Sequence, residues 1–209
     1  MDIVLIDALE PFGYDHLLPR GTLRESLIGL RRAGVVALSR ADLIDAAERK
    51  EIWRRVRRIA PDAACLELAH RPQRLVAAEG AEMPLSDLAD LPVAAFCGIG
   101  NPDGFRRTLR SCGCRLSALK ELPDHFPYDR PDVEELAAWA DSIGDCEAVI
   151  CTQKDLVKLR VSQLGGRPLW ALAIELEILK GLEDFEVLLE KLATQAEAVG
   201  DVPGLDDPA

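Results

Sequence analysis

Short hydrophobic runs alternate along this chain with longer amphipathic stretches. A strand buried on both faces reads as a continuous apolar run, whereas an amphipathic helix repeats apolar residues three or four apart. The alternation recurs about six times, which is typical of βα units around a largely parallel sheet. We therefore predict an α/β fold of three layers, in which helices flank a mostly parallel sheet. The predicted strands are Ile3 to Ile6, Val35 to Leu38, Ala63 to Leu68, Val93 to Cys97, Arg115 to Leu119, Ala148 to Cys151 and Leu169 to Ile174.

Two helices between these strands have recognisable starts. One is predicted from Arg40 to Ile59, because Ser39 and Asp42 have the spacing of a capping box. Another begins after Asn101, a good N-cap residue that is followed by proline at the first helical position.

The segment from Glu82 to Pro92 has no compelling period and contains two prolines, so we place a domain boundary there. This gives one domain at 1–82 and a carboxy-terminal α/β subdomain at 93–195. Residues 196–209 are predicted to be a flexible tail, because they contain too little apolar surface to offset the entropy of ordering.

Composition supports a globular protein. The chain has 209 residues, of which 48% are hydrophobic and 29% charged, and this is enough for a buried core. Its apolar runs are far shorter than the roughly 20 residues of a membrane-spanning helix. The first residues lack a basic leader and a cleavage site, so we expect a cytoplasmic location. A net charge of −11 argues against binding to nucleic acid.

The six cysteines are scattered, several of them inside apolar runs, and are expected to be reduced core thiols. Cys112 and Cys114 have neither a matching second pair nor a nearby histidine, which disfavours a zinc site. The arginines between Arg54 and Arg58 lie opposite the apolar stripe of their predicted helix. They form either a solvated face or a contact surface for anionic lipid headgroups.

The first candidate for chemistry follows the first predicted strand. Asp7 stands at the carboxyl end of that strand, where α/β proteins bind ligands, and the long loop from Ala8 to Thr22 follows it. Arg24 and Glu25 then fall at a predicted helix start. A guanidinium there can clamp phosphate oxygens and a carboxylate can hold Mg²⁺. The alternative is an exposed ion pair.

A second candidate is the turn that contains Gly98, Gly100 and Asn101, where a strand leads into a helix. Backbone N–H groups at a helix amino terminus attract anions. Asp103 replaces the third glycine of a dinucleotide-binding fingerprint, so a tight structural turn is the alternative.

Two further candidates carry titratable groups. His125 lies in a proline-rich loop, and an imidazole can shuttle a proton near neutral pH; a surface histidine without a role is the alternative. Asp124 is expected to point away from it, as neighbours do in an extended loop. Lys154 and Asp155 follow a strand and can present a carboxylate to a nucleotide base, or cap a helix.

Taken in order, these segments resemble the tetraacyldisaccharide 4'-kinases of lipid A biosynthesis. The family's Asp-Ile-Val-Leu-Ile-Asp-Ala, Pro-Phe-Gly and Leu-Leu-Pro-x-Gly-x-Leu-Arg-Glu segments all appear between Asp2 and Glu25. Gly-Ile-Gly-Asn-Pro, Asp-His and Thr-x-Lys-Asp follow from Gly98, Asp124 and Thr152. The resemblance extends to about Leu192 and departs from the usual pattern at Ser26, Phe126 and Gln153.

The resemblance implies a P-loop NTPase-like kinase fold. It further implies transfer of the ATP γ-phosphate, with Mg²⁺, to the 4'-hydroxyl of a lipid A disaccharide precursor at the cytoplasmic face of the inner membrane. An anionic membrane surface is then a partner of this peripheral protein. His125, Arg24 and Glu25 are the implied catalytic residues, with Glu25 also supporting the metal. The implied cofactor-binding residues are Asp7, Gly98, Gly100, Asn101, Lys154 and Asp155.

The phosphate-binding loop of such kinases is missing, because the chain contains no Gly-Lys dipeptide. Phosphoryl transfer depends on that loop and its lysine for positioning and charge neutralisation. We therefore expect a carboxy-terminal portion that is inactive alone, with 1–82 as the remainder of the P-loop domain and ATP and Mg²⁺ held largely by an amino-terminal half. The alternative is a noncatalytic ligand-binding or interaction module. A GTPase-like interpretation of the segment Ser39 to Asp42 requires the same absent loop.

Overall fold

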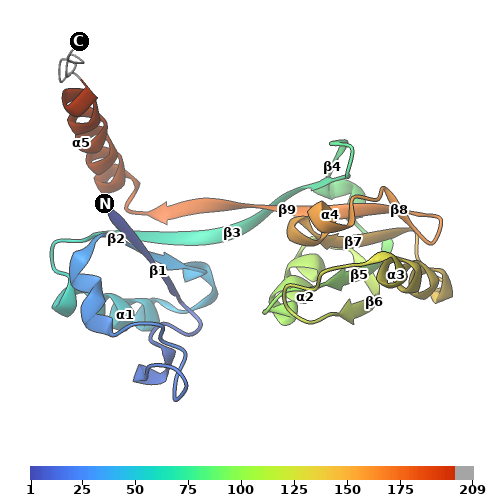
Figure 1. The fold of residues 1–209 in the computed structure, drawn as a ribbon, viewed down its shortest axis with the longest axis horizontal. Helices are drawn as coiled ribbons and strands as arrows, with labels where there is room; N and C mark the ends of the chain where they lie inside the picture. Colours follow the sequence, from blue (N-terminus) through green and yellow to red (C-terminus); the bar gives the residue numbers. More distant parts are fainter. Residues whose placement is uncertain (201–209) are drawn as a thin grey trace, which may run out of the picture. The chain divides into compact units, whose positions relative to one another are not determined.

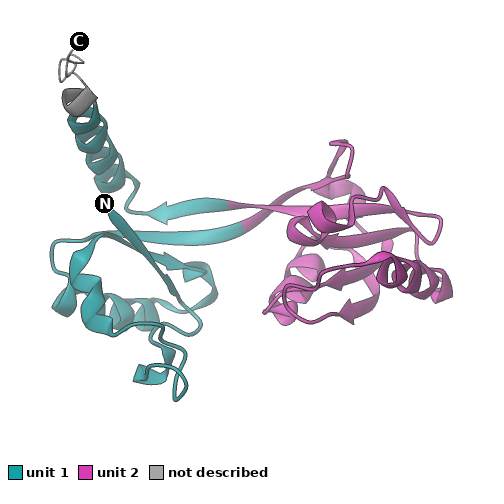
Figure 2. Cartoon of the chain, in the orientation of Figure 1, with its two compact units in different colours: residues 1–70, 176–209 teal, residues 71–175 magenta. Residues whose placement is uncertain are grey.

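The computed structural model describes the backbone of residues 1–200 and the side chains of residues 1–196. The chain forms two compact units, one from residues 1–70 together with 176 onward, and one from 71–175 (Figure 2). The predicted boundary between Glu82 and Pro92 is wrong, since this segment lies inside the second unit. The division instead falls within two long strands, where no loop signals it. The predicted tail falls on the chain end, of which 201–209 lie outside the described residues.

The first unit is a small parallel sheet covered on both faces. Val36 and Leu38 of β2 pack on one face with Ile52 and Val56 of α1. Val35 and its neighbours on the opposite face pack with α5. The parallel strands are β1 (Asp2–Asp7), β2 (Ala33–Ser39) and the start of β3 (Ala64–Val76), joined by the end of β9 (Arg167–Lys180). The helices are α1 (Ala46–Ile59), α5 (Leu182–Gly200) and the 3-10 segments Gly13–Asp15, Leu27–Arg32 and Ala41–Leu43 (Figure 1).

The second unit has the same layered organisation. Phe105 and Leu109 of α2 pack on one face of β5, and Leu136 of α3 and Leu156 of α4 pack on the other. Its parallel strands follow the order β9, β7 (Ala148–Thr152), β5 (Pro92–Cys97) and β6 (Arg115–Glu121). The remaining elements are β4 (Glu82–Pro84), β8 (Gln163–Leu164), the 3-10 segment Leu85–Leu88, α2 (Pro102–Ser111), α3 (Arg130–Ser142) and α4 (Gln153–Leu159).

The predicted fold class is confirmed: a mostly parallel sheet lies between flanking helices, and a strand stands at each of the seven predicted positions. Two strands extend far beyond their predicted ends, because β3 continues to Val76 and β9 to Lys180. Their extensions carry polar side chains such as Arg74, which pairs with Glu82 and Glu175 at 2.8 Å each. An apolar run therefore marks only the part of each strand that is buried on both faces.

The predicted helix start at Arg40 is wrong. Arg40 adopts a left-handed conformation (φ 59°), which is incompatible with a continuous α-helix, and the α-helix begins only at Ala46. Its capping box is formed by Asp45 and Glu48, whose side chains each accept a hydrogen bond from the other's backbone N–H.

The turn from β9 into α5 requires glycine at position 181. Gly181 has φ +87°, and a Cβ there would lie 2.0 Å from the carbonyl oxygen of Cys65. We expect Gly181→Ala to lower the free energy of unfolding by about 3 kcal/mol, because the backbone must shift in addition to the penalty for positive φ. Gly80→Ala is the matched control, since Gly80 has φ +85° with nothing within 4 Å of the added Cβ. It should cost about 1 kcal/mol. Urea denaturation measures both, and equal losses would contradict the steric argument.

Candidate functional site

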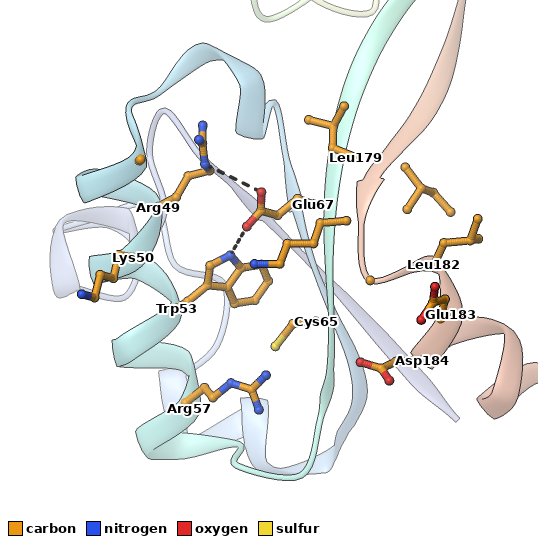
Figure 3. A pocket seen from close by; sticks show the side chains of 14 residues that line it. Arg49, Lys50, Trp53, Arg57, Cys65, Glu67, Leu179, Leu182, Glu183 and Asp184 are labelled. Carbon is orange, nitrogen blue, oxygen red and sulfur yellow. Dashed lines mark hydrogen bonds and ion pairs between the residues drawn. The ribbon is translucent and has the colours of Figure 1, made fainter.

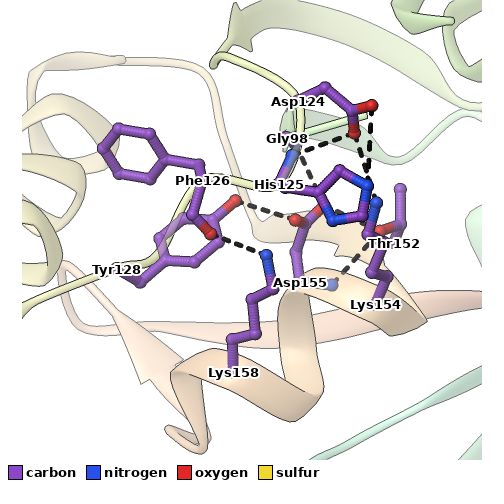
Figure 4. A network of polar contacts seen from close by, with 9 residues as sticks. All are labelled: Gly98, Asp124, His125, Phe126, Tyr128, Thr152, Lys154, Asp155 and Lys158. Atoms are coloured by element: carbon purple, nitrogen blue, oxygen red, sulfur yellow. Dashed lines mark hydrogen bonds and ion pairs between the residues drawn. The ribbon is translucent and has the colours of Figure 1, made fainter. Parts of the chain in front are cut away.

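The centre of the polar network in the second unit is Asp155, near the start of α4. Among the residues with described side chains, it is the only charged one that is fully buried. Its carboxylate accepts hydrogen bonds from the Tyr128 hydroxyl (2.9 Å), the Thr152 hydroxyl (2.7 Å) and the backbone N–H of Gly98 (3.2 Å) (Figure 4). Three segments distant in sequence therefore meet on one carboxylate.

Local sequence explains why the segments approach so closely. Thr152 is the N-cap of α4, and its hydroxyl accepts from the backbone N–H of Asp155 at 3.3 Å. Gly98 follows β5, where an added Cβ would lie 3.2 Å from both Asp155 Oδ1 and the Tyr128 hydroxyl. Any larger residue would crowd the hydrogen bonds that the carboxylate accepts.

The loop that carries His125 is fastened at its backbone. The His125 N–H donates to Asp124 Oδ1 (2.9 Å) and to the Gly98 carbonyl (3.2 Å). Lys158 donates from Nζ to the Phe126 carbonyl at 2.7 Å. The imidazole itself is 76% exposed. The structure thus fixes the backbone of this loop while leaving the His125 ring accessible.

Asp124 lies closer to His125 than predicted. Its Oδ2 is 3.8 Å from His125 Nε2, and its Oδ1 accepts from Lys154 Nζ at 3.2 Å. The prediction that the two neighbours point apart is wrong, because His125 has a left-handed backbone (φ 62°) where we expected an extended one. The Lys154 hydrogen bond lowers the pKa of the Asp124 carboxyl below its usual value, so this group is an anion near neutral pH.

Burial and the charge on Asp155 set the protonation of its neighbours. Burial, followed by the Asp155 charge, raises the pKa of the Tyr128 hydroxyl far above its usual value. The same two causes raise the pKa of the Cys97 thiol to about 11. Both groups therefore keep their protons at physiological pH, and Tyr128 serves as a hydrogen-bond donor.

The structure brings together Gly98, Gly100, His125, Lys154 and Asp155 from the predicted set. Gly100 belongs to this group because a Cβ there would lie 3.4 Å from Asp124 Oδ2. Asp155, however, is enclosed, so its carboxylate positions the surrounding loops.

Asn101 lies next to this group and is the predicted N-cap of α2. Its side chain accepts from the Gly104 N–H at 2.9 Å. The capping interpretation is therefore confirmed, while a role in cofactor binding stays a prediction.

A second polar cluster lies in the first unit, at the carboxyl ends of β1 and β2 and beside His70 in the middle of β3. Asp7 accepts from Arg40 Nε (2.9 Å) and from the Leu9 N–H (3.0 Å). The Ser39 hydroxyl lies 2.9 Å from His70 Nε2. Burial, and then the charge of Arg40, lower the pKa of His70. We did not predict His70; its position directly after the apolar run of β3 is the signal that could have identified it.

Arg24 and Glu25 do not start a helix, because they precede Ser26, the N-cap of the Leu27–Arg32 segment. Arg24 is exposed. Both carboxylate oxygens of Glu25 accept from Arg32 Nη2, at 2.7 and 2.8 Å.

Glu25 is therefore tied to the amino end of β1, since the same Arg32 also holds Asp2 through Nε at 3.0 Å. A strand rises about 3.3 Å per residue, so the two ends of β1 lie roughly 16 Å apart. The structure thus leaves Glu25 and Asp7 at opposite ends of one strand, although the sequence analysis grouped them in one candidate site.

A cavity of about 920 Å³ has none of the predicted site residues on its walls. It lies in the first unit between α1, β3, the end of β9 and α5 (Figure 3). Trp53 Nε1 donates to Glu67 Oε1 at 2.9 Å on its wall. Lysine and arginine line it together with acidic residues, which favours no single ligand charge. Within the described part of the chain, no group of three or more His, Cys, Asp or Glu side chains is placed to hold a metal ion.

The three hydrogen bonds to Asp155 predict a graded loss of stability. Asp155→Asn should lower the free energy of unfolding by about 2–4 kcal/mol, because the new amide turns an N–H toward buried donors. Tyr128→Phe removes one donor and should cost about 1–2 kcal/mol. Tyr14→Phe, at an exposed tyrosine, should stay within about 0.5 kcal/mol of the unchanged protein. Urea unfolding of the three variants tests this order, and an Asp155→Asn variant as stable as Tyr14→Phe would refute it.

Comparison with known proteins gives the family context of these clusters. The family model described as tetraacyldisaccharide-1-P 4'-kinase matches residues 1–194. The tetraacyldisaccharide 4'-kinase of Anaeromyxobacter sp. (strain K) is 37% identical over 91% of this chain and 50% of its own length. That of Elusimicrobium minutum is 34% identical, with the same shares of 91% and 50%. The chain thus spans about half the length of the curated relatives it matches.

The fold shows the same relationship. The crystal structure of LpxK from Aquifex aeolicus in complex with ATP superposes with a TM-score of 0.62 at 22% identity. The superposition covers 91% of this chain and 52% of that one. With the match of the family model over nearly the whole chain, these comparisons show that the chain belongs to the tetraacyldisaccharide-1-P 4'-kinase family.

Proposed function

We propose that this chain contributes the His125 side of an ATP-dependent kinase that phosphorylates the 4'-hydroxyl of tetraacyldisaccharide 1-phosphate. The observation that carries the proposal is the geometry at His125. An exposed imidazole stands beside the anionic Asp124, on a loop anchored to a buried carboxylate. Membership in the kinase family supplies the reaction type.

In the proposed reaction, the 4'-hydroxyl oxygen bonds to the γ-phosphorus of ATP while the bond from that phosphorus to the bridging oxygen of ADP breaks. The hydroxyl proton must leave as the new bond forms, and an imidazole suits this transfer near neutral pH. His125 assists that deprotonation, together with a carboxylate from outside this chain. Asp124 stabilises a protonated His125 ring from 3.8 Å, and Lys154 keeps Asp124 ionised.

The proposal also includes residues whose chemistry suits contact with ATP. Arg24 presents an exposed guanidinium that suits phosphate oxygens, and Gly98 and Gly100 border the turn before α2. Asp7 stands at a strand's carboxyl end, the usual side for ligands in such sheets. Both carboxylate oxygens of Glu25 are engaged by Arg32, and the described residues contain no group of three or more His, Cys, Asp or Glu side chains placed to hold a metal ion, so this chain's residues do not fit a Mg²⁺ site.

The absence of a Gly-Lys dipeptide predicts no catalysis by this chain alone. Purified 1–209, incubated with ATP, Mg²⁺ and tetraacyldisaccharide 1-phosphate, should give no 4'-phosphorylated product above the uncatalysed background. Transfer of ³²P from γ-labelled ATP to the lipid measures this directly. Measurable turnover would overturn our account of the missing loop.

The role of His125 is tested once the chain is joined to the half of the Anaeromyxobacter sp. kinase that it does not span. In such an active fusion, His125→Ala should lower kcat about 10²–10³-fold while leaving the melting temperature unchanged. Arg130→Ala is the control, because Arg130 is 90% exposed and begins the helix just after this loop. A kcat unaffected by His125→Ala would favour a noncatalytic ligand-binding module.

Peripheral contact with the anionic cytoplasmic face of the inner membrane is the last part of the proposal. No helix within the described residues is long and apolar enough to cross a membrane. On α1, Arg54 pairs with Glu51, and Arg55 pairs with Asp15 over the ring of Phe12. The basic face predicted from the sequence is therefore partly neutralised within the chain. The other exposed arginines of α1 are Arg57 and Arg58.

Replacing these two arginines should weaken binding to a charged membrane. Arg57→Gln with Arg58→Gln is expected to reduce co-sedimentation with vesicles that contain phosphatidylglycerol, since each basic residue contributes about 1 kcal/mol at such a surface. Arg107→Gln with Arg110→Gln on α2 makes the same charge change on the other unit as a control. If both double variants sediment like the unchanged protein, the membrane role of α1 is excluded.

A further inference from the structure

The cavity of the first unit has walls of opposite charge (Figure 3). On one side, α1 contributes Arg49, Lys50 and Arg57. On the other side, the first turn of α5 contributes Glu183 and Asp184. All the residues that line the cavity belong to the first unit. A positive wall therefore faces a negative one across a space of about 920 Å³.

Cys65 marks the place where the two walls approach each other. This residue of β3 stands between Arg57 and Asp184 in Figure 3. Burial raises the pKa of its thiol, and the charges of Arg57, Asp184 and Lys180 act on the thiol in that order after burial. Charges of both signs thus reach one point on the cavity wall.

One pair of charges on the wall is satisfied within the protein. Glu67 lies 3.7 Å from Arg49 Nε and accepts a hydrogen bond from Trp53 Nε1 at 2.9 Å. The hydrogen bond also orients the indole ring of Trp53, which lines the cavity. Arg49 and Glu67 therefore neutralise each other, and the charge of a ligand is decided by the other lining residues.

The other charged side chains of the cavity are not matched in this way. Within the described part of the chain, no ion pair involves any of the following five: Lys50, Arg57, Lys180, Glu183 and Asp184. An anion bound here would meet the acids of α5, and a cation would meet the basic residues of α1. A molecule that carries both signs of charge can pair with both walls, which makes a zwitterion the ligand of matching charge.

Apolar side chains line the same cavity. Ile178 and Leu179 of β9 and Leu182 of α5 contribute to it, and Leu179 is 40% and Leu182 44% exposed. Small-molecule sites in proteins have volumes of about 300–1,000 Å³, so this cavity is near the upper end of that range. A free amino acid would fill only a small part of it. The volume and the apolar lining therefore favour a ligand with an apolar tail beside its charged groups.

We propose that this cavity binds a zwitterionic amphiphile, in which an ethanolamine phosphate group carries an apolar tail. The phosphate faces Arg57 and Lys180, because guanidinium and ammonium groups both suit phosphate oxygens. The ammonium group of the ligand faces Asp184, and the tail lies along Leu179 and Leu182. The proposal goes beyond the kinase reaction and does not rest on it, since no predicted site residue lines this cavity.

The test compares two lipids with the same short tails. Dihexanoyl phosphatidylethanolamine carries both charges, whereas dihexanoyl phosphatidylglycerol carries the negative charge alone. Isothermal titration calorimetry of 1–209 with each lipid, kept below the concentration at which it forms micelles, measures the two Kd values. We expect saturable one-to-one binding of the ethanolamine lipid, about 10-fold tighter than that of the glycerol lipid, because only the former pairs with the α5 wall.

Two variants separate the walls. Asp184→Asn should weaken the ethanolamine lipid about 10-fold and leave the Kd of the glycerol lipid unchanged or lower, since only an ammonium group needs this carboxylate. Lys180→Gln should weaken both lipids. Glu190→Gln and Lys191→Gln make the same charge changes at exposed positions of α5 outside the cavity, and should alter neither Kd.

Folding is controlled within the same experiment. An Asp184→Asn variant that binds the glycerol lipid normally must be folded, so a loss confined to the ethanolamine lipid reports the lost charge. For Lys180→Gln, which weakens both lipids, a melting temperature equal to that of Lys191→Gln shows that the variant is folded.

Alkylation by iodoacetamide locates the bound lipid without any substitution. Cys65, Cys112 and Cys146 are all partly buried, but only Cys65 lines the cavity. Saturating ethanolamine lipid should slow the alkylation of Cys65 and leave that of Cys112 and Cys146 in the second unit unchanged. Mass spectrometry of the digested protein measures the three rates.

The tail is tested with glycerophosphoethanolamine, which has the same charged group and no acyl chains. It should bind about 10-fold more weakly than the ethanolamine lipid, since it leaves the apolar lining uncovered. Equal affinity would overturn the amphiphile in favour of a soluble ethanolamine phosphate.

Three further results would overturn the proposal: no binding of the ethanolamine lipid, equal affinity for both lipids, or binding that leaves the alkylation of Cys65 unchanged. The kinase proposal is separate from all of these. Loss of activity on His125→Ala has no bearing on this cavity, and a cavity that binds neither lipid leaves the role of His125 intact.

Discussion

The second unit depends on the enclosure of one negative charge. A carboxylate taken out of water must be matched by donors, or the cost of burial exceeds what packing returns. Asp155 meets this requirement with a tyrosine hydroxyl, a threonine hydroxyl and the N–H of Gly98. Each donor lies on a different segment, so satisfying the charge fixes the turn after β5, the loop after β6 and the start of α4 at once. His125 owes its fixed backbone to this arrangement, although it does not touch Asp155.

Sequence patterns predicted the strands well because burial on both faces leaves a simple trace. Val35 to Leu38 and Val93 to Cys97 are apolar at every position, since each side chain meets a helix on one face or the other. Where β3 and β9 lose that double burial, polar residues replace apolar ones and the pattern ends before the strand does. The division of the chain into units was missed for the same reason.

The candidate site was harder to predict, because it depends on backbone conformation and on distant partners. Adjacent side chains point apart only in an extended chain, and the left-handed backbone at His125 brings Asp124 beside the imidazole. Nothing next to Asp155 in sequence indicates that Tyr128 will donate to it. Likewise, the sequence analysis grouped Asp7 and Glu25 in one candidate site, yet Arg32 holds Glu25 at the end of β1 that is far from Asp7. Capping by Asn101 was predictable because its partner is three residues away.

The crossing of the chain between units on β3 and β9 also sets the order in which the parts can form during synthesis. A ribosome releases residues 1–70 first, then the whole second unit, and only afterwards the end of β9 and α5. Val35 and Ala37 are buried under Phe185 and Leu188 in the finished protein, so that face of β2 has no cover while the intervening residues are being made. The second unit, continuous in sequence, is complete before then. Its folding thus precedes the closing of the domain into which it is inserted, and a delay within 71–175 prolongs the time for which a nascent apolar sheet face is open to other chains.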